Sequence, residues 1–212
     1  MAQNYLLIVG TSGHSRCLYD LAHRLGYKPW LQNIYPSEIA EISIILPNKV
    51  PTKRPIPFIV GIGSNFQRMT IFNSLINETK LKPISLIDKS SSVSPFAKVG
   101  IGSVVMPQSV IGAGVEIKSN CVINSGAIIE HDCTMQDHSS IAPRSVICGE
   151  SSIGFCSFVG AGVIINEKIQ IGNHTFIGSG STVVSNIPSS VLAYGSPAKI
   201  RRPRTHDEIH LV

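Results

Sequence analysis

The sequence predicts a small α/β domain followed by an all-β solenoid, and two patterns carry this prediction. From Val93 to Val183, every sixth residue is aliphatic or Met, which gives sixteen positions in register without an exception. Before this repeat, short apolar segments alternate with amphipathic ones, as strands and helices do in an α/β sheet. We therefore expect one domain over residues 1–87, a second over residues 88–187, and a tail over residues 188–212.

The first domain begins with the apolar segment Tyr5–Val9, which is typical of a buried parallel strand. An amphipathic helix is expected next, and Gly26 ends it. A second strand over residues 58–62, a second helix over residues 69–76 and a last strand over residues 84–87 complete the pattern. This alternation predicts a small Rossmann-like sheet, with its ligand groups at the carboxyl ends of the strands.

The first two strands each end in a glycine-containing turn that precedes a helix. The turn residues are Gly10, Ser12, Gly13 and His14 after the first strand, and Gly63 and Asn65 after the second. Backbone N–H groups at the start of a helix are free to bind an anion. Together the two turns predict a phosphate-bearing ligand, whereas a tight turn without a ligand explains the first of them equally well.

The six-residue period fits neither an α-helix nor an ordinary half-buried strand, but it fits a coil with flat sides. The residue four places after each aliphatic is mostly small or β-branched. Each hexad therefore has one large and one small inward position, which lets a short strand turn a corner without overfilling the interior. A purely mechanical solenoid is the alternative interpretation of this repeat.

Charge, aromatic content and cysteine spacing exclude several classes of protein. The net charge is +5, with 15% charged and 6% aromatic residues, which argues against a nucleic-acid surface. The basic excess in the tail, formed by Lys199, Arg201, Arg202 and Arg204, favours a small anionic ligand instead. The five cysteines lack metal-type spacing and are typical of buried, reduced thiols. No apolar segment is long enough for a signal peptide or a membrane span, so we expect a cytoplasmic protein without membrane insertion.

Five landmarks together carry a family resemblance. They are the Gly10–His14 turn, the Gly61–Asn65 loop, the hexads, the segment Asn124–Cys133 and the segment Gly195–Lys199. The chain resembles bacterial hexapeptide-repeat acetyltransferases that N-acetylate UDP-4-amino-4,6-dideoxy sugars in bacillosamine-type synthesis, and their sialic-acid O-acetyltransferase relatives. The resemblance implies a left-handed parallel β-helix with three hexads per coil, hence about five coils. It also implies acetyl-CoA as the co-substrate, no metal, and a homotrimer with active sites between subunits.

The resemblance assigns His131 as the catalytic base and Asp132 as the acidic residue that orients it. We expect CoA to contact Gly149, Ala161, Gly178, Ser179, Gly180, Pro197, Lys199 and Arg201. We expect the nucleotide sugar to contact Gly10, Ser12, Gly13, His14, Gln32, Asn33, Gly63, Asn65 and Asn124.

Two segments depart from the family pattern. Ser140 stands where the family has a second histidine, and His138 lies two residues before it. Gln32 and Asn33 stand where relatives carry paired aspartates near the nucleotide. The sequence therefore leaves open whether His138 or Ser140 takes over the role of the missing histidine.

The position of His131 in its hexad makes it the clearest candidate for chemistry in the repeat. It is the third residue of the hexad, so its ring should project outward, with Gly149 stacked above it and Ala113 below. A neutral imidazole can remove the proton of an attacking amine or hydroxyl, and Asp132 would fix its tautomer. This requires a corner in the backbone, because adjacent residues on a flat strand point apart. A backbone N–H near Gly149 would stabilise the oxyanion, and direct attack is favoured over an acyl-enzyme.

Three alternatives stay open at this point. The acceptor is an amine in one interpretation and a hydroxyl of a sialic-acid-like sugar in another. A metalloenzyme resembling γ-type carbonic anhydrases needs three converging histidines, whereas His138 and His174 should lie two coils apart and His131 at a different hexad position. A non-catalytic sugar-nucleotide-binding scaffold would bind no CoA. The sequence names neither the acceptor sugar nor the pathway.

Overall fold

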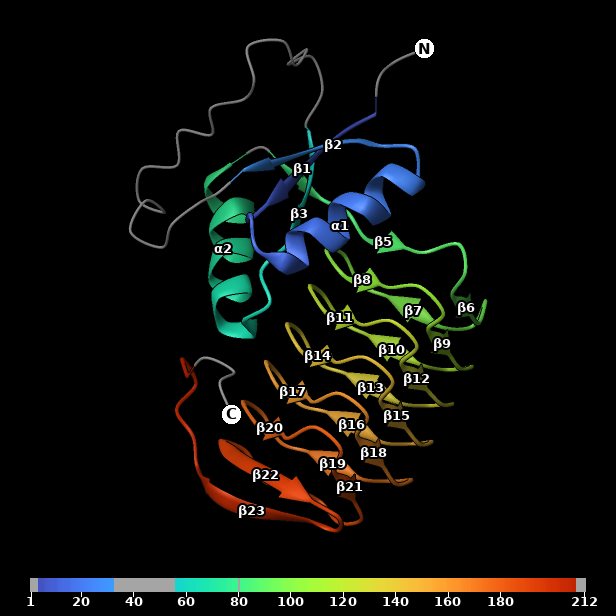
Figure 1. Ribbon diagram of the computed structural model, residues 1–212, viewed down its shortest axis with the longest axis vertical. Helices are drawn as coiled ribbons and strands as arrows, with labels where there is room; N and C mark the ends of the chain where they lie inside the picture. The colour runs from blue at the N-terminus through green and yellow to red at the C-terminus, as the bar shows by residue number, and fades with distance from the viewer. Residues whose placement is uncertain (1–3, 33–55, 80, 209–212) are drawn as a thin grey trace. The chain divides into compact units, whose positions relative to one another are not determined.

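The computed structural model describes residues 4–32, 56–79 and 81–208. These residues divide into two compact units. The first comprises the described residues up to Gly63 together with Gln67–Ile84, and the second comprises Ser64–Phe66 and the described residues from Ser85 onward. In Figure 1, the short strands of the second unit are stacked in successive turns.

A four-stranded parallel sheet with strand order β2-β1-β3-β4 is the centre of the first unit. Its elements are β1 (Tyr5–Val9), α1 (Gly13–Arg24), β2 (Lys28–Gln32), β3 (Pro57–Val60), α2 (Asn65–Glu78) and β4 (Lys82–Pro83). The central strand β1 is almost wholly buried from Leu6 to Val9, as its unbroken apolar sequence predicts. On α1 the buried positions include Ser15 and Leu18, whereas Cys17 is exposed, so the expectation that all five cysteines are buried was wrong.

The prediction that residues 84–87 form the last strand of the first domain was also wrong. The last strand of the first sheet is β4, and Leu86–Ile87 forms β5, which pairs in parallel with β8 (Val104–Val105) of the second unit. Ile87 lies six residues before Val93, so the hexad spacing already extends to it. The apolar character of this segment predicted a strand, but its spacing determined which sheet it joins.

The second unit is a parallel β-solenoid of two-residue strands. After β5 and before the last hairpin, these strands are β6 (Ser92–Val93), β7 (Lys98–Val99), β8 (Val104–Val105), β9 (Val110–Ile111), β10 (Glu116–Ile117), β11 (Val122–Ile123), β12 (Ile128–Ile129), β13 (Thr134–Met135), β14 (Ser140–Ile141), β15 (Val146–Ile147), β16 (Ser152–Ile153), β17 (Phe158–Val159), β18 (Ile164–Ile165), β19 (Gln170–Ile171), β20 (Phe176–Ile177) and β21 (Thr182–Val183). They form three sheets, of five, six and eight strands.

Each strand pairs with the strand 18 residues further along the chain, as Ile129 does with Ile147 and Ile147 with Ile165. At three strands per turn, the sixteen hexad strands make just over five turns, and the solenoid as a whole has about six, one more than the predicted five. The additional turn comes from β5 before the hexads and from β22 (Val191–Gly195) after them, which pairs with β20. This architecture agrees with the predicted left-handed parallel β-helix.

The interior of the solenoid is filled by the large aliphatic of each hexad, and Ile129, Ile147 and Ile165 are 0% exposed. The small inward serines satisfy their hydroxyl groups by donating to a backbone carbonyl of the next turn. Ser145 donates to the carbonyl of Gly160 at 2.7 Å, and Ser157 donates to that of Gly172 at 2.6 Å. Because a buried hydroxyl is costly only when it lacks a partner, serine is tolerated at these inward positions.

The corners between sheets use a left-handed backbone conformation at the fourth hexad position. Non-glycine residues with positive φ at this position include Asn120, Asp132, Arg144, Glu150 and Lys168, with φ between 55° and 59°. Gly114 and Gly126 occupy the same position with φ of 74° and 67°. At the corners, successive side chains can therefore point to the same side, whereas on a flat strand they alternate.

The chain continues from the solenoid into an antiparallel hairpin of β22 and β23 (Ala198–Pro203). A cis peptide bond joins Ser196 to Pro197 in the turn between them. Among the residues that the structure describes, no helix is long and apolar enough to cross a membrane.

Candidate functional site

His131 and Asp132 form a hydrogen-bonded pair at the corner between β12 and β13. Nδ1 of His131 lies 3.0 Å from Oδ2 of Asp132, and the two side chains are 59% and 65% exposed. Asp132 has a φ of 57°, so the backbone turns the corner that the sequence required for adjacent side chains to meet. Both side chains project from the solenoid, as the position of His131 in its hexad predicts.

The carboxylate of Asp132 fixes the tautomer of the imidazole. A carboxylate only accepts hydrogen bonds, so Nδ1 of neutral His131 carries the proton and Nε2 keeps its lone pair. This hydrogen bond is the largest cause of a raised pKa at His131. The negative charges of Asp132, Glu150 and Glu130 raise the same pKa further. Nε2 is therefore a strengthened base that faces outward.

The turns on either side of His131 hold its backbone and pack closely against its ring. The amide of Glu150 in the following turn donates to the carbonyl of His131 at 3.0 Å, and Asp132 donates to the carbonyl of Ala113 in the preceding turn at 2.9 Å. Gly149 lies directly against the imidazole, since a Cβ atom on this glycine would be 2.5 Å from Nε2. The predicted stacking of Gly149 and Ala113 about His131 is thus present.

The structure places Ser140 and His138 away from this corner. Ser140 is buried in β14 of the eight-stranded sheet, where its hydroxyl donates to Oδ1 of Asn65 at 2.6 Å. His138 is buried at another corner, where Nδ1 lies 2.8 Å from Nδ2 of Asn120 and the ring meets Phe155 edge-on. The structure therefore brings neither residue to His131.

Asn65, a predicted sugar-nucleotide contact, uses its carboxamide within the second unit. Its Nδ2 donates to the carbonyls of Ser157 at 2.9 Å and Cys156 at 3.3 Å, and its Oδ1 accepts from Ser140. Asn65 is 1% exposed, so its side chain has a structural role in holding these segments of the second unit together. No sequence pattern predicts this arrangement, because Asn65 and its partners are 75 to 92 residues apart.

The glycine turns of the first unit adopt the conformations that require glycine. Gly10 has a φ of 119°, and its amide donates to the carbonyl of Gln32 at 2.7 Å. A Cβ atom on Gly10 would lie 2.8 Å from Oγ of Ser15, whose hydroxyl donates to the carbonyl of Gly61 at 2.7 Å. Ser12 donates to the same carbonyl at 3.2 Å. The first two strand-ending turns are therefore held together at one edge of the sheet.

Gly13 begins α1, and His14 follows it with a side chain whose Nε2 is shut off from solvent. Burial, with a smaller contribution from the Arg68 guanidinium, lowers the pKa of His14 to about 4. His14 is therefore neutral at neutral pH, and Nε2 has no hydrogen-bond partner among the described residues. Arg68 is itself buried and donates to the carbonyls of Ile62 and Gly63. Of the pair that departs from the family pattern, Gln32 ends β2 and is half-buried, while Asn33 lies outside the described residues.

The predicted CoA contacts fall at two different corners of the solenoid and in the hairpin that follows it. Gly149 is beside His131, between the six-stranded and five-stranded sheets. Pro197, Lys199 and Arg201 belong to the hairpin of β22 and β23. Ala161 lies at the corner between the eight-stranded and six-stranded sheets, where its amide donates to Ser179 and its carbonyl accepts from the amide of Gly180 at 2.8 Å. Asn124, Gly178, Ser179 and Gly180 belong to this second corner too, by the 18-residue register.

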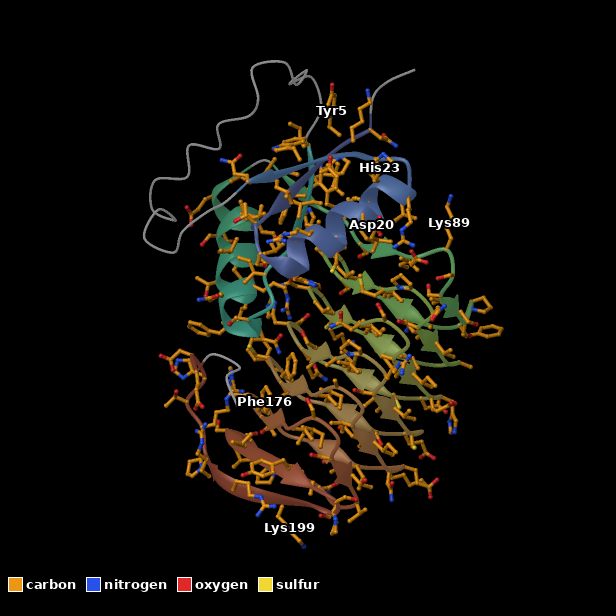
Figure 2. The ribbon with its side chains drawn as sticks, viewed as in Figure 1. Tyr5, Asp20, His23, Lys89, Phe176 and Lys199 are labelled. Atoms are coloured by element: carbon orange, nitrogen blue, oxygen red, sulfur yellow. The ribbon has the colours of Figure 1, made fainter. Side chains whose placement is uncertain are left out.

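The four basic side chains of the tail differ in the contacts that they make. Arg202 is bound to the carboxylate of Glu208, and Arg204 is bound to the backbone carbonyl of Glu208 while it lies over the ring of Phe176 at 5.4 Å. Arg201 stacks on the exposed ring of Tyr194 at 4.5 Å. Lys199 projects from β23 into solvent (Figure 2). Pro197, in the turn before β23, is exposed. Among these four side chains, Lys199 and Arg201 are exposed and have no carboxylate partner within the described part of the chain, and their contact with a phosphate stays a prediction.

The metalloenzyme alternative requires side chains that converge on one ion. Within residues 4–32, 56–79 and 81–208, no group of three or more His, Cys, Asp or Glu side chains is placed to hold a metal. Phe155 separates two of the three repeat histidines, because its ring packs against His138 at 5.4 Å and against His174 at 5.4 Å.

Sequence reasoning missed the two glutamates that act on His131. Glu150 follows Asp132 by 18 residues, one turn further along the same corner, and Lys168 follows Glu150 by the same interval with Nζ 3.7 Å from its Oε1. Glu130 directly precedes His131. The 18-residue register would have revealed the stacked column of Asp132, Glu150 and Lys168.

Known proteins resemble the chain in sequence over a short stretch and in structure over nearly its whole length. No family model matches the chain. Galactoside O-acetyltransferases from Lactococcus lactis and Escherichia coli are 42% and 39% identical to it over 45 and 51 residues. These stretches are 21% and 24% of this chain and 22% and 25% of those proteins, so the match spans about a quarter of the length of the curated relatives.

Two solved structures share the architecture. The acetyltransferase domain of PglB from Neisseria gonorrhoeae superposes with a TM-score of 0.82 at 25% identity, covering 94% of this chain and 100% of that one. A histidine-to-alanine mutant of GDP-perosamine N-acetyltransferase from Caulobacter crescentus, in complex with CoA and GDP-perosamine, superposes with a TM-score of 0.85 at 25% identity. It covers 95% of this chain and 98% of that one. In its hexad solenoid and over nearly its whole length, the chain is similar to acetyltransferases of known structure.

Proposed function

We propose that the chain transfers the acetyl group of acetyl-CoA to the amino group of a nucleotide-linked 4-amino-4,6-dideoxy sugar, with His131 as the general base. The observation that carries this proposal is the pair of His131 and Asp132, with Nε2 unprotonated, outward-facing and beside a glycine. The proposal is supported by likeness to a GDP-perosamine N-acetyltransferase structure that contains CoA and GDP-perosamine.

In the proposed reaction, Nε2 of His131 takes a proton from the acceptor amine as its nitrogen attacks the thioester carbonyl. The new C–N bond forms, the C–S bond breaks, and the protonated imidazole gives its proton to the sulfur, so CoA leaves as the thiol and His131 is neutral again. The amide of Gly149 is the proposed oxyanion donor, since it donates no hydrogen bond within the described part of the chain and adjoins Nε2. Asp132 holds the tautomer that keeps Nε2 available.

The charges around His131 favour an amine over a hydroxyl as the acceptor. Glu130, Asp132 and Glu150 surround the imidazole closely enough to raise its pKa, and of these three Glu150 has Lys168 as a cationic neighbour at 3.7 Å. A primary amine reaches the site mostly as an ammonium ion, which negative charge attracts, whereas a hydroxyl gains nothing from this field. A base of raised pKa is also closer in pKa to an ammonium ion, so it takes the ammonium proton more readily than an ordinary histidine does.

The proposed assembly is a homotrimer with each active site between two chains. It is supported by the separation of Gly149 and His131 at one corner from Ala161 and Gly180 at another, with the six-stranded sheet between the two corners. A single CoA that contacts both groups would bridge corners of different chains. The first unit is proposed to act as a Rossmann-like domain that binds the nucleotide of the sugar, supported by its parallel sheet and the Gly10 turn.

The direct test is to incubate the protein with acetyl-CoA and a UDP- or GDP-linked 4-amino-4,6-dideoxy sugar and to measure released CoA thiol. Transfer to the amine identifies the proposed reaction. Transfer only to hydroxyl acceptors, such as a galactoside or a sialic-acid-like sugar, would assign O-acetylation instead. Binding of the nucleotide sugar without any binding of CoA would indicate a non-catalytic scaffold.

Activity should fall as the pH is lowered through the raised pKa of His131. The base must be neutral to accept a proton, so a raised pKa moves the acid limb of kcat/KM above the position expected for an ordinary histidine. Asp132→Asn removes the carboxylate that is the largest cause of the shift, so the acid limb should move to lower pH while the maximum rate falls. A pH–rate profile measured with both proteins checks this, and an acid limb at the same pH in the variant would contradict it.

The exposed cations of the hairpin should matter for acetyl-CoA binding, whereas the paired one should not. Lys199→Met removes a charge that is free to meet a phosphate, and such hydrogen bonds contribute about 1.5–3 kcal/mol, so KM for acetyl-CoA should rise by roughly tenfold or more. Arg202→Met is the control, because its guanidinium is occupied by Glu208. Equal KM values for acetyl-CoA in both variants would mean that the phosphates of CoA do not contact Lys199.

A further inference from the structure

We propose that Gly114 is a positioning residue of the site, because the absence of a side chain there keeps the Asp132 carboxylate on Nδ1 of His131. Gly114 lies 18 residues before Asp132, at the same corner one turn earlier. Both residues are in the left-handed region, with φ of 74° and 57°. The catalytic consequence rests on the proposed role of His131, but the placement of the carboxylate does not.

The space beside Gly114 is already filled by the carboxylate. A Cβ atom on Gly114 would lie 2.3 Å from Oδ1 of Asp132 and 3.3 Å from its Cγ. The backbone nitrogen of Asp132 would be 3.6 Å away, which is an ordinary contact. The conflict is therefore with the end of one side chain and not with the coil.

Asp132 can relieve that conflict by rotating its own side chain, which is 65% exposed. The rotation moves Oδ2 away from Nδ1 of His131, whose hydrogen bond with Oδ2 is 3.0 Å long. Gly112, two residues earlier, differs in kind: a Cβ atom there would lie 2.8 Å from the backbone nitrogen of His131 and 3.0 Å from the carbonyl carbon of Glu130. A side chain at Gly112 must displace the coil, whereas one at Gly114 needs to displace only the carboxylate.

The loss of this hydrogen bond has two chemical effects on His131. The Nδ1–H tautomer is no longer fixed, so a fraction of the imidazole presents a protonated Nε2 that cannot act as a base. The hydrogen bond is also the largest cause of the raised pKa of His131, so its loss lowers the basicity of Nε2. Gly114 thus acts on the base through Asp132 without touching a reactant.

The test follows the His131 imidazole by NMR titration in Gly114→Ala, with the signal assigned by its loss in His131→Gln. The pKa of His131 should fall toward its ordinary value in Gly114→Ala. Gly126→Ala is the matched control, because Gly126 has a φ of 67° and the nearest atom to its Cβ position is Cγ of Arg144 at 3.6 Å. It introduces the same backbone strain without reaching Asp132, so the pKa of His131 should not change.

A double-mutant cycle with Asp132→Ala decides whether Gly114 acts through Asp132. In the Asp132→Ala background, Gly114→Ala should produce no further change in the pKa of His131. An equal fall of that pKa with and without the Asp132 carboxylate, or no fall in Gly114→Ala alone, would overturn the proposal. Because the titration needs no substrate, it remains decisive even if no acceptor is acetylated.

The kinetic arm applies once an acceptor is in hand. Gly114→Ala should lower kcat by about tenfold or more, within the 10²–10⁴ that general-base catalysis supplies, and should leave KM for acetyl-CoA unchanged. Gly126→Ala should retain the parent kcat. A rise in KM for acetyl-CoA without a change in kcat would overturn the positioning role.

Discussion

Replacing His131 with alanine should lower kcat/KM for acetyl transfer by about 10²- to 10⁴-fold, the contribution of a well-placed general base. The substitution removes an exposed imidazole whose Nδ1 is held by a carboxylate and whose Nε2 is unprotonated. It should leave the fold intact, because the imidazole is 59% exposed and outside the packed interior. Initial rates of CoA release with the best acceptor found for the parent protein measure the effect.

His131→Gln is the companion variant, since it keeps a polar side chain of similar size but cannot accept a proton at neutral pH. Both variants should have the thermal midpoint of the parent protein. Rates within about twofold of the parent in both would remove His131 from the mechanism and leave the fold assignment untouched. A rate loss accompanied by a matching loss of folded protein would show a structural effect instead.

Replacing Ile147 with alanine should lower the free energy of unfolding by roughly 2–5 kcal/mol, as is usual for a large-to-small change in a packed interior. Ile147 is 0% exposed and lies in the column of large aliphatics between Ile129 in the preceding turn and Ile165 in the following one. Two-residue strands leave little room for the backbone to collapse into the resulting cavity, because each turn is hydrogen-bonded to both neighbours. Urea-induced unfolding measures the loss.

Ile101→Ala provides the matched control, since it removes the same atoms from a turn residue that is 54% exposed. Its effect on the free energy of unfolding should stay within about 0.5 kcal/mol, as for most surface substitutions. Similar losses for the two variants would mean that the hexad aliphatics do not carry the stability of the solenoid.

The hexad spacing predicted side-chain direction well, because backbone pairing between turns fixes both the period and the register. It placed Gly149 against the imidazole of His131 and Ile129 in the interior, as the structure has them. The number of turns was underestimated, since the count stopped where the aliphatic ladder stopped and left out the strands at Leu86 and Val191 that continue the stack.

Contacts that depend on distant segments could not be predicted from the spacing. The hydrogen bond between Ser140 and Asn65 joins residues 75 apart, and no periodicity links them. The division of the basic cluster depends on where Glu208 returns against Arg202, which is set by the fold of the tail after β23. The corner at Asp132 was stated as a requirement, but a left-handed residue other than glycine is not readable from a single aspartate.

Because each turn of the solenoid touches only the turn before and the turn after, fraying should begin at the two ends and move inward. The corner that carries His131 lies between β12 and β13, in the third of about six turns. Its neighbours named above come from the adjoining turns, except Lys168, which lies one turn beyond Glu150. Local unfolding of the terminal turns therefore leaves the candidate base and its carboxylate in place. Amide hydrogen exchange near His131 should accordingly be among the slowest in the solenoid.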